Sequence, residues 1–372
     1  MDQELERVAG LLRDARDPED LLGAEPVLLP RGVQLGKRKC AYEALKAVTS
    51  LLYQSPDDND IARDLDRRLE EFYLQAKNRI EIGAYNLQGR GGTVPPGYRA
   101  RFFDAGVRRY YIGARRREGG ETTLYDGYLE IAGVALGEVI LKVAKTPETS
   151  AFVEREANVL GMLRKEDYRE TSYLPWPLDR FETGGRMGIV MRRIDGFNLE
   201  EVREHPPYRD GLDARDMVWM LSRTLAVMGM AHQYGVVHGR ICPEHVVIEP
   251  STHRGIVVGW GGSAIAPVRT GQCVLGAIDT FSAPEAAGST AGPWSDIYSI
   301  GKTYLWLVGG DPKTNEIPPQ VEPRLAAFLR SMVNEDSYHR PDDCWQLFET
   351  LERMKTELWG ERKWRNLEMP AP

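Results

Sequence analysis

Residues 235–248 read GVVHGRICPEHVVI, and residues 255–263 read GIVVGWGGS. These two stretches decide the fold, and they lie in the second half of the chain, where helical patterns dominate from about residue 210. On their N-terminal side, strand patterns dominate between about residues 107 and 145. The chain therefore places a sheet-rich part before a helix-rich part.

The sheet-rich part contains three segments rich in β-branched and aromatic residues and separated by glycines. They read RRYYIGA (108–114), TTLYDGYLEIA (122–132) and EVILKVAK (138–145). A helical period follows over residues 149–164, and the stretch 217–235 is apolar on nearly every face. A helix of the latter kind is expected to be buried.

The composition is that of an ordinary globular protein: of 372 residues, 42% are hydrophobic and 28% are charged. Such a chain can bury a sizeable core, which excludes global disorder. The net charge of −7 does not indicate a dedicated nucleic-acid binder. The N-terminus does not resemble a signal peptide, and no apolar run approaches the ~20 residues of a membrane span, so we expect a cytoplasmic protein without a membrane contact. Four cysteines without a CxxC pair and six histidines without an HExxH pattern predict no metal site.

The N-terminal residues 1–88 read as helices. An apolar stripe at spacings of three and four residues runs along 61–80, and a shorter stripe along 41–53 indicates a second helix. Pro56 lies between the two stripes and predicts the turn of a helical hairpin. A Gly- and Pro-rich linker follows at 89–98.

Residues 99–117 are rich in arginine, with Asp104 as the one acidic residue among them. Two interpretations are open. The arginines can occupy solvated positions of strands and loops, or they can form a surface for an anionic partner such as phosphate or nucleic acid.

Residues 107–355 resemble the eukaryotic-type protein kinase fold. The landmarks are the two stretches quoted first, together with Lys142 in VILKV, Glu156 in FVEREANVL, Met191 in IVMRRIDGFNLEEV, Glu285 in FSAPEA, Asp296 in SDIYSIGKTYLWLV and Arg340 in HRP. The resemblance implies an α+β, two-lobed fold with a small β-rich lobe at 99–194, a large helical lobe at 195–360 and a tail at 361–372. It also implies structural roles for His238, Glu285, Asp296 and Arg340.

The positions that carry the chemistry in this family differ here. Protein kinases use an aspartate base in the HRD triplet, a metal-binding asparagine five residues later and a metal-binding aspartate in DFG. The corresponding residues are Arg240, His245 and Gly259. An arginine cannot accept a proton near neutral pH, and a glycine has no side chain to bind a metal. The sequence therefore predicts a pseudokinase, which is not an enzyme, with Trp260 filling the core beside the former metal site. Nearby acids such as Glu244 could in principle substitute, but for Glu244 a position on the surface of the loop is the favoured interpretation.

Nucleotide binding is a separate question. The resemblance places Gly119 and Gly120 in the glycine-rich loop, Lys142 and Glu156 at the phosphate-binding ion pair and Met191 at the gatekeeper position. The alternative for Lys142 and Glu156 is a buried ion pair with a structural role only. We expect no cofactor, or at most weak, magnesium-independent ATP binding.

The N-terminal hairpin resembles a J-domain. The resemblance covers residues 15–85 and rests on DPEDLLG (17–23), KRKCAYEALKAVTSLLY (37–53) and a QSPDDN loop with Ser55, Pro56 and Asp57. J-domains have a histidine where Ser55 stands, and they need it to stimulate their heat-shock partner. A chaperone contact and a hairpin that docks on the kinase-like lobes or self-associates both stay open.

The function predicted from the sequence is a regulatory scaffold that acts through an unidentified protein partner, as in bacterial proteins that join a J-domain-like segment to degenerate kinase lobes. The first alternative is an atypical ATP-dependent phosphotransferase. The second alternative is a J-type cochaperone.

Overall fold

A computed structural model describes residues 94–98, 101–106, 108–131, 134–165, 169–276, 279–286, 291–360, 365 and 367–370. The predicted helical module 1–88, with Ser55, Pro56 and Asp57 in its J-like loop, lies outside the described residues. The chain divides into two compact units. One comprises 1–96, 106–110 and 128–137, and the other comprises 97–105, 111–127 and 138–372. All candidate site residues of the kinase-like resemblance belong to the second unit.

The first lobe along the chain is a six-stranded sheet with the strand order β1-β2-β3-β4-β6-β5. Its strands are β1 Arg101–Ala105, β2 Arg108–Glu118, β3 Thr122–Ile131, β4 Val134–Ala144, β5 Pro177–Thr183 and β6 Arg186–Arg192. Along the second half of β3, burial alternates, so that Leu129 and Ile131 face the core. The antiparallel pairing of β4 with β6 places Lys142 opposite Ile189.

Helix α5, Ser150–Leu163, packs against β6 because its apolar residues recur at helical spacing. Val153 and Ala157 from this helix form a small core with Ala144 and Ile189. Glu156 lies on the same buried face. The helix thereby holds a carboxylate over the sheet, next to β4.

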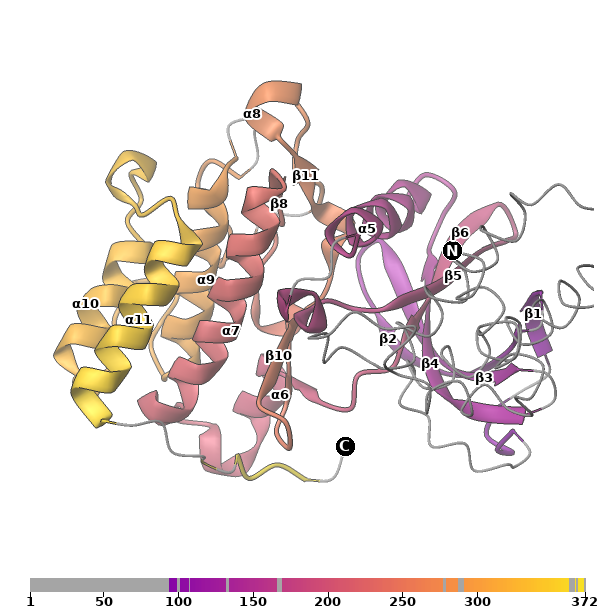
Figure 1. Cartoon of the computed structure of the whole chain (residues 1–372), viewed down its shortest axis with the longest axis horizontal. Helices are drawn as coiled ribbons and strands as arrows, with labels where there is room; N and C mark the ends of the chain where they lie inside the picture. Colours follow the sequence, from indigo (N-terminus) through magenta and orange to yellow (C-terminus); the bar gives the residue numbers. More distant parts are fainter. Residues whose placement is uncertain are drawn as a thin grey trace, which may run out of the picture. The chain divides into compact units, whose positions relative to one another are not determined.

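The second lobe is helical and is built around α7, Ala214–Gln233 (Figure 1). The predicted burial of this apolar helix is confirmed, since nearly every residue from Asp216 to Ala231 is buried. Its other helices are α6 Leu199–Glu204, α8 Pro267–Thr270, α9 Pro293–Leu307, α10 Pro323–Met332 and α11 Cys344–Trp359. Helix α7 packs against both α9 and α11, and α10 packs against α9. The order of a sheet-rich lobe before a helical lobe is therefore as the sequence predicts.

Two small sheets connect these helices. One contains β7 Phe197–Asn198, β9 Val246–Glu249 and β10 Arg254–Val257, and the other pairs β8 Val236–Val237 with β11 Ala264–Ile265. Local sequence fixes the helix starts: Asn198 and Glu201 form a capping box on α6, and Asp343 caps α11. Within the described residues, no helix is long and apolar enough to span a membrane.

Candidate nucleotide site

The centre of the candidate site is an ion pair between the sheet and helix α5. Lys142 Nζ on β4 lies 2.5 Å from Glu156 Oε2. The Glu156 side chain is only 1% exposed and that of Lys142 is 13% exposed. A buried carboxylate needs such a partner, because an unpaired buried charge is strongly destabilising. Lys142 is the more exposed member of this ion pair.

The loop that follows β8 is anchored by Asp296 at the start of α9. Asp296 accepts hydrogen bonds from the backbone N–H of His238 (2.8 Å) and of Gly239 (2.7 Å), and it is fully buried. Its carboxylate also contacts His232 Nε2 at 2.9 Å. Gly239 has a φ of 76°, which favours glycine. One buried carboxylate, that of Asp296, thus fixes the backbone that leads into Arg240.

His245 and Gly259 occupy one shared space. Gly259 has a φ of 84°, and a Cβ there would lie 2.7 Å from the His245 ring. The ring donates from Nδ1 to the carbonyl oxygen of Arg240 at 2.6 Å. An aspartate at position 259 therefore does not fit beside this histidine, and the two residues are a matched pair.

Both imidazoles of the site are neutral at neutral pH. Burial is the main cause that lowers the pKa of His245 to about 3, and His238, Arg240 and Lys142 lower it further. Burial also lowers the pKa of His238. His238 donates from Nε2 to the Val258 carbonyl at 3.0 Å, as a structural histidine does. His238 also packs edge-on against the fully buried Trp260, with ring centroids 4.7 Å apart.

Arg240 points toward the turn between β2 and β3. Its NH1 lies 3.3 Å from Glu121 Oε2. Gly119 and Gly120 precede this glutamate, and the Gly119 N–H donates to the Thr122 carbonyl at 2.9 Å, which closes the turn. The Lys145 N–H, just past β4, donates to the Glu121 carbonyl at 3.0 Å and fixes the turn against the sheet.

A second set of charges lies near the same turn. Arg117 NH2 lies 3.3 Å from Glu200 Oε2 and also pairs with Glu244. Burial raises the pKa of Glu244 and Arg117 lowers it, with the net shift upward. Glu244 is therefore an exposed carboxylate of the loop, as the surface interpretation expects, and it is paired with Arg117.

The predicted gatekeeper and the predicted glutamate–arginine pair are both partly or fully buried. Met191 is on β6, partly buried against the small core of α5 and the sheet. Glu285 Oε1 is 2.7 Å from NH1 of Arg340, whose side chain is fully buried. Burial alone would raise the pKa of Glu285, but hydrogen bonds from Arg340 and Ser295 hold the pKa below its usual value.

Sequence reasoning missed one acid and one arginine. It did not single out Glu121, although the acidic residues that flank two glycines in EGGE (118–121) are visible in the sequence. It also missed Arg155 on α5, whose NH1 donates to the carbonyls of Ser263 (3.0 Å) and Cys273 (3.1 Å). The partners of Arg155 are more than 100 residues away, which no local pattern indicates.

The arginine-rich stretch is largely neutralised by neighbouring acids. Contacts with carboxylates are made by Arg101, Arg109, Arg115, Arg116 and Arg117. The interpretation as solvated strand and loop positions is therefore favoured over a surface for an anionic partner.

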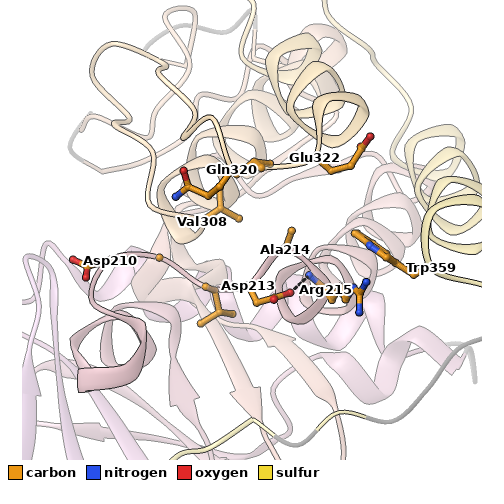
Figure 2. A pocket seen from close by; sticks show the side chains of 11 residues that line it. Asp210, Asp213, Ala214, Arg215, Val308, Gln320, Glu322 and Trp359 are labelled. Carbon is orange, nitrogen blue, oxygen red and sulfur yellow. Dashed lines mark hydrogen bonds between the residues drawn. The ribbon is translucent and has the colours of Figure 1, made fainter.

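A separate pocket lies in the helical lobe. It has a volume of about 430 Å³ and is lined by the loop before α7 and the start of that helix, by the residue that follows α9, by the residues that precede α10 and by the end of α11 (Figure 2). Asp210, Asp213 and Glu322 make this lining acidic, while Arg215 lies near Trp359. None of the residues predicted for nucleotide binding lines it.

Lobe order, the lysine–glutamate pair and the anchored loop define a protein kinase-like fold. The chain matches no known family profile. It is 26% identical over 277 residues to a probable serine/threonine-protein kinase, pknA2, of Bifidobacterium longum, covering 67% of this chain and 35% of that protein. It is 26% identical over 233 residues to the probable serine/threonine-protein kinase PknB of Lactococcus lactis (60% of this chain, 34% of the relative).

A third relative is the serine/threonine-protein kinase PknA of Mycobacterium tuberculosis, 27% identical over 223 residues, which covers 52% of this chain and 49% of the relative. The chain spans between about a third and a half of the length of these curated relatives. The similarity to serine/threonine kinases contradicts the prediction that the protein is not an enzyme, and that prediction was wrong. Arg240, His245 and Gly259 change which groups are present at the site, and they do not by themselves show that its chemistry is lost.

Proposed function

We propose that the protein is an atypical ATP-dependent phosphotransferase that acts on hydroxyl groups of proteins. The observation that carries the proposal is the Lys142–Glu156 ion pair, held at 2.5 Å between β4 and α5. In protein kinases, this pair must be in place for phosphoryl transfer, because the lysine positions the phosphates of ATP. The names of the similar proteins support the same reaction class and a serine or threonine acceptor.

Magnesium does not fit the residues at the usual metal positions. Mg²⁺ prefers oxygen ligands in octahedral geometry. His245 offers a ring whose Nδ1 is already bonded to the Arg240 carbonyl, and Gly259 offers no side chain. The space for a carboxylate at 259 is filled by the His245 ring. We therefore propose that nucleotide binding is independent of magnesium and that side-chain cations neutralise the phosphates.

Phosphoryl transfer requires little covalent chemistry from the protein, because positioning of the reactants and neutralisation of the phosphate charges supply most of the catalysis. A bond forms between the acceptor oxygen and the γ-phosphorus, and the bond from that phosphorus to ADP breaks. We assign the proton of the acceptor hydroxyl to Glu244. Glu244 is the carboxylate of the loop that carries Arg240, and burial raises its pKa, which favours a proton acceptor.

The test is transfer of radiolabelled phosphate from ATP to the protein itself or to a generic protein substrate, with EDTA and with magnesium. We expect transfer in both conditions. Removing Lys142 alone would leave Glu156 buried and unpaired, so the variant combines Lys142→Met with Glu156→Gln. We expect this variant to remain folded and to lose transfer.

Lys313→Ala is the matched control, because Lys313 is an exposed lysine in the helical lobe. It should transfer phosphate as the wild type does. Transfer that survives in the Lys142→Met, Glu156→Gln variant would overturn the proposal, and so would the absence of both transfer and ATP binding in the wild type.

A further inference from the structure

Arg240 and Glu121 form a weak contact that we call the phosphate latch. NH1 of Arg240 lies 3.3 Å from Oε2 of Glu121, and the two side chains are 24% and 25% exposed. A single contact of this length between partly exposed groups contributes little to stability. A guanidinium makes its strong pairs in a bidentate arrangement with a planar anion or a phosphate. Arg240 is therefore held by a partner that a better anion can replace.

The backbone around Arg240 is shaped to receive its side chain. A Cβ at Gly276 would lie 2.6 Å from Arg240 NH1, and a Cβ at Gly262 would lie 3.2 Å from its Cδ. A larger residue at Gly276 would displace the guanidinium, and one at Gly262 would crowd the Leu275 carbonyl oxygen and the Arg240 Cδ. The two glycines thus form a slot that directs Arg240 toward the glycine turn.

Two ion pairs supply the charges around the latch. The His245 ring donates to the Arg240 carbonyl, and the positive charges of Arg240 and Lys142 both lower the pKa of His245. Glu156 pairs with Lys142, and Glu121 pairs with Arg240. Of these two carboxylates, Glu156 is 1% exposed and fixed in a helix, whereas Glu121 is on a turn. Glu121 is the carboxylate that can leave.

We propose that Arg240 binds the terminal phosphate of the nucleotide and that Glu121 occupies this guanidinium until the phosphate replaces it. The inference rests on the proposed function, since it requires that ATP binds beside Lys142. A phosphate offers several oxygens and more charge than a carboxylate, so it forms the stronger pair with Arg240. Glu121 then acts as an internal competitor that weakens ATP binding. Lys142 and Arg240 together supply positive charge at the site that lacks ligands for magnesium.

The experiment measures the dissociation constants of ATP and AMP by calorimetry, in EDTA, for the full chain. Glu121→Gln should bind ATP about two- to fivefold more tightly, because the competing charge is gone. Arg240→Gln should bind ATP at least about tenfold more weakly and leave AMP within about twofold, because AMP lacks the terminal phosphates. The double variant should match Arg240→Gln, since Glu121 has then lost its partner.

Asp126→Asn is the matched control. Asp126 pairs with Arg116 at 2.9 Å on neighbouring strands, so this change removes one acidic partner of an arginine away from the latch. It should leave ATP binding within about twofold of the wild type. Thermal unfolding of every variant without nucleotide checks that each one is folded.

The outcomes separate the two proposals. If the wild type binds ATP but Arg240→Gln binds it equally well, the latch is refuted and the nucleotide site at Lys142 stands. The latch is also refuted if Glu121→Gln tightens ATP binding by the same factor in the Arg240→Gln background. If neither the wild type nor Glu121→Gln binds ATP, the proposed function fails and the latch fails with it.

Discussion

Replacing Gly259 by aspartate restores the residue type that protein kinases use to bind metal, and the structure predicts that this change is destabilising. Two effects add. An L-residue in the left-handed region at φ 84° costs roughly 1–2 kcal/mol. A Cβ 2.7 Å from the His245 ring overpacks the site, which costs roughly 1–3 kcal/mol. We expect Gly259→Asp to lower the free energy of unfolding by roughly 2–5 kcal/mol.

The assay is urea unfolding followed by tryptophan fluorescence. Gly271→Asp is a control for the backbone effect alone, because Gly271 has a φ of 69° and nothing lies within 4 Å of a Cβ there. Gly271→Asp should lower the free energy of unfolding by only roughly 1–2 kcal/mol. The difference between the two variants measures the contact with His245.

A second substitution tests that contact directly. In the His245→Ala background, Gly259→Asp should cost roughly 1–3 kcal/mol less than in the wild type, since the ring is gone. If Gly259→Asp costs no more than Gly271→Asp, or if its cost is the same in both backgrounds, the two residues are not a matched pair and the reasoning is refuted.

Two further predictions concern buried charges and pH. Arg340→Ala leaves Glu285 without its buried partner and should lower the free energy of unfolding in urea by about 3–5 kcal/mol. Arg324→Ala, which removes one member of an exposed ion pair, should lower it by less than about 1 kcal/mol. Equal losses of stability in the two variants would contradict the buried role of Arg340. The folded-state pKa of His245 lies at about 3, below its unfolded value of 6.5, so the unfolded chain binds more protons between these values and stability falls as pH decreases from 6.5 toward 3. Urea midpoints at pH 7 and pH 5 should therefore differ more for the wild type than for His245→Gln, and an unchanged difference would contradict the assignment.

Much of the fold could be predicted because its signals are local. The apolar pattern of 217–235 predicts a buried helix, and α7 is that helix. The glycine-separated strand segments predict the sheet. Hydrophobic periodicity depends on neighbouring residues, so a single sequence is sufficient to read it. The J-like features with Ser55, Pro56 and Asp57 lie outside the described residues and stay predictions.

The site was less predictable, because its important contacts join distant residues. Arg240 and Glu121 are 119 positions apart, and no spacing rule connects them. The sequence shows that His245 and Gly259 replace metal-binding types, but only the structure shows that they fill one space. The loss of three chemical residue types led to the prediction that the protein is not an enzyme, which the similarity to serine/threonine kinases contradicts. The structure instead shows substitutions that fit one another.

The pairing of His245 with Gly259 also restricts the order in which such a site can change. Starting from an aspartate at 259 and a small side chain at 245, the histidine fits only after the aspartate has become glycine. In the reverse direction, aspartate returns only after the histidine has gone. Introducing the aspartate first passes through a less stable protein, and most proteins have little stability to lose. With His245 in place, an aspartate at position 259 therefore needs changes at both positions, and the change at 245 has to come first.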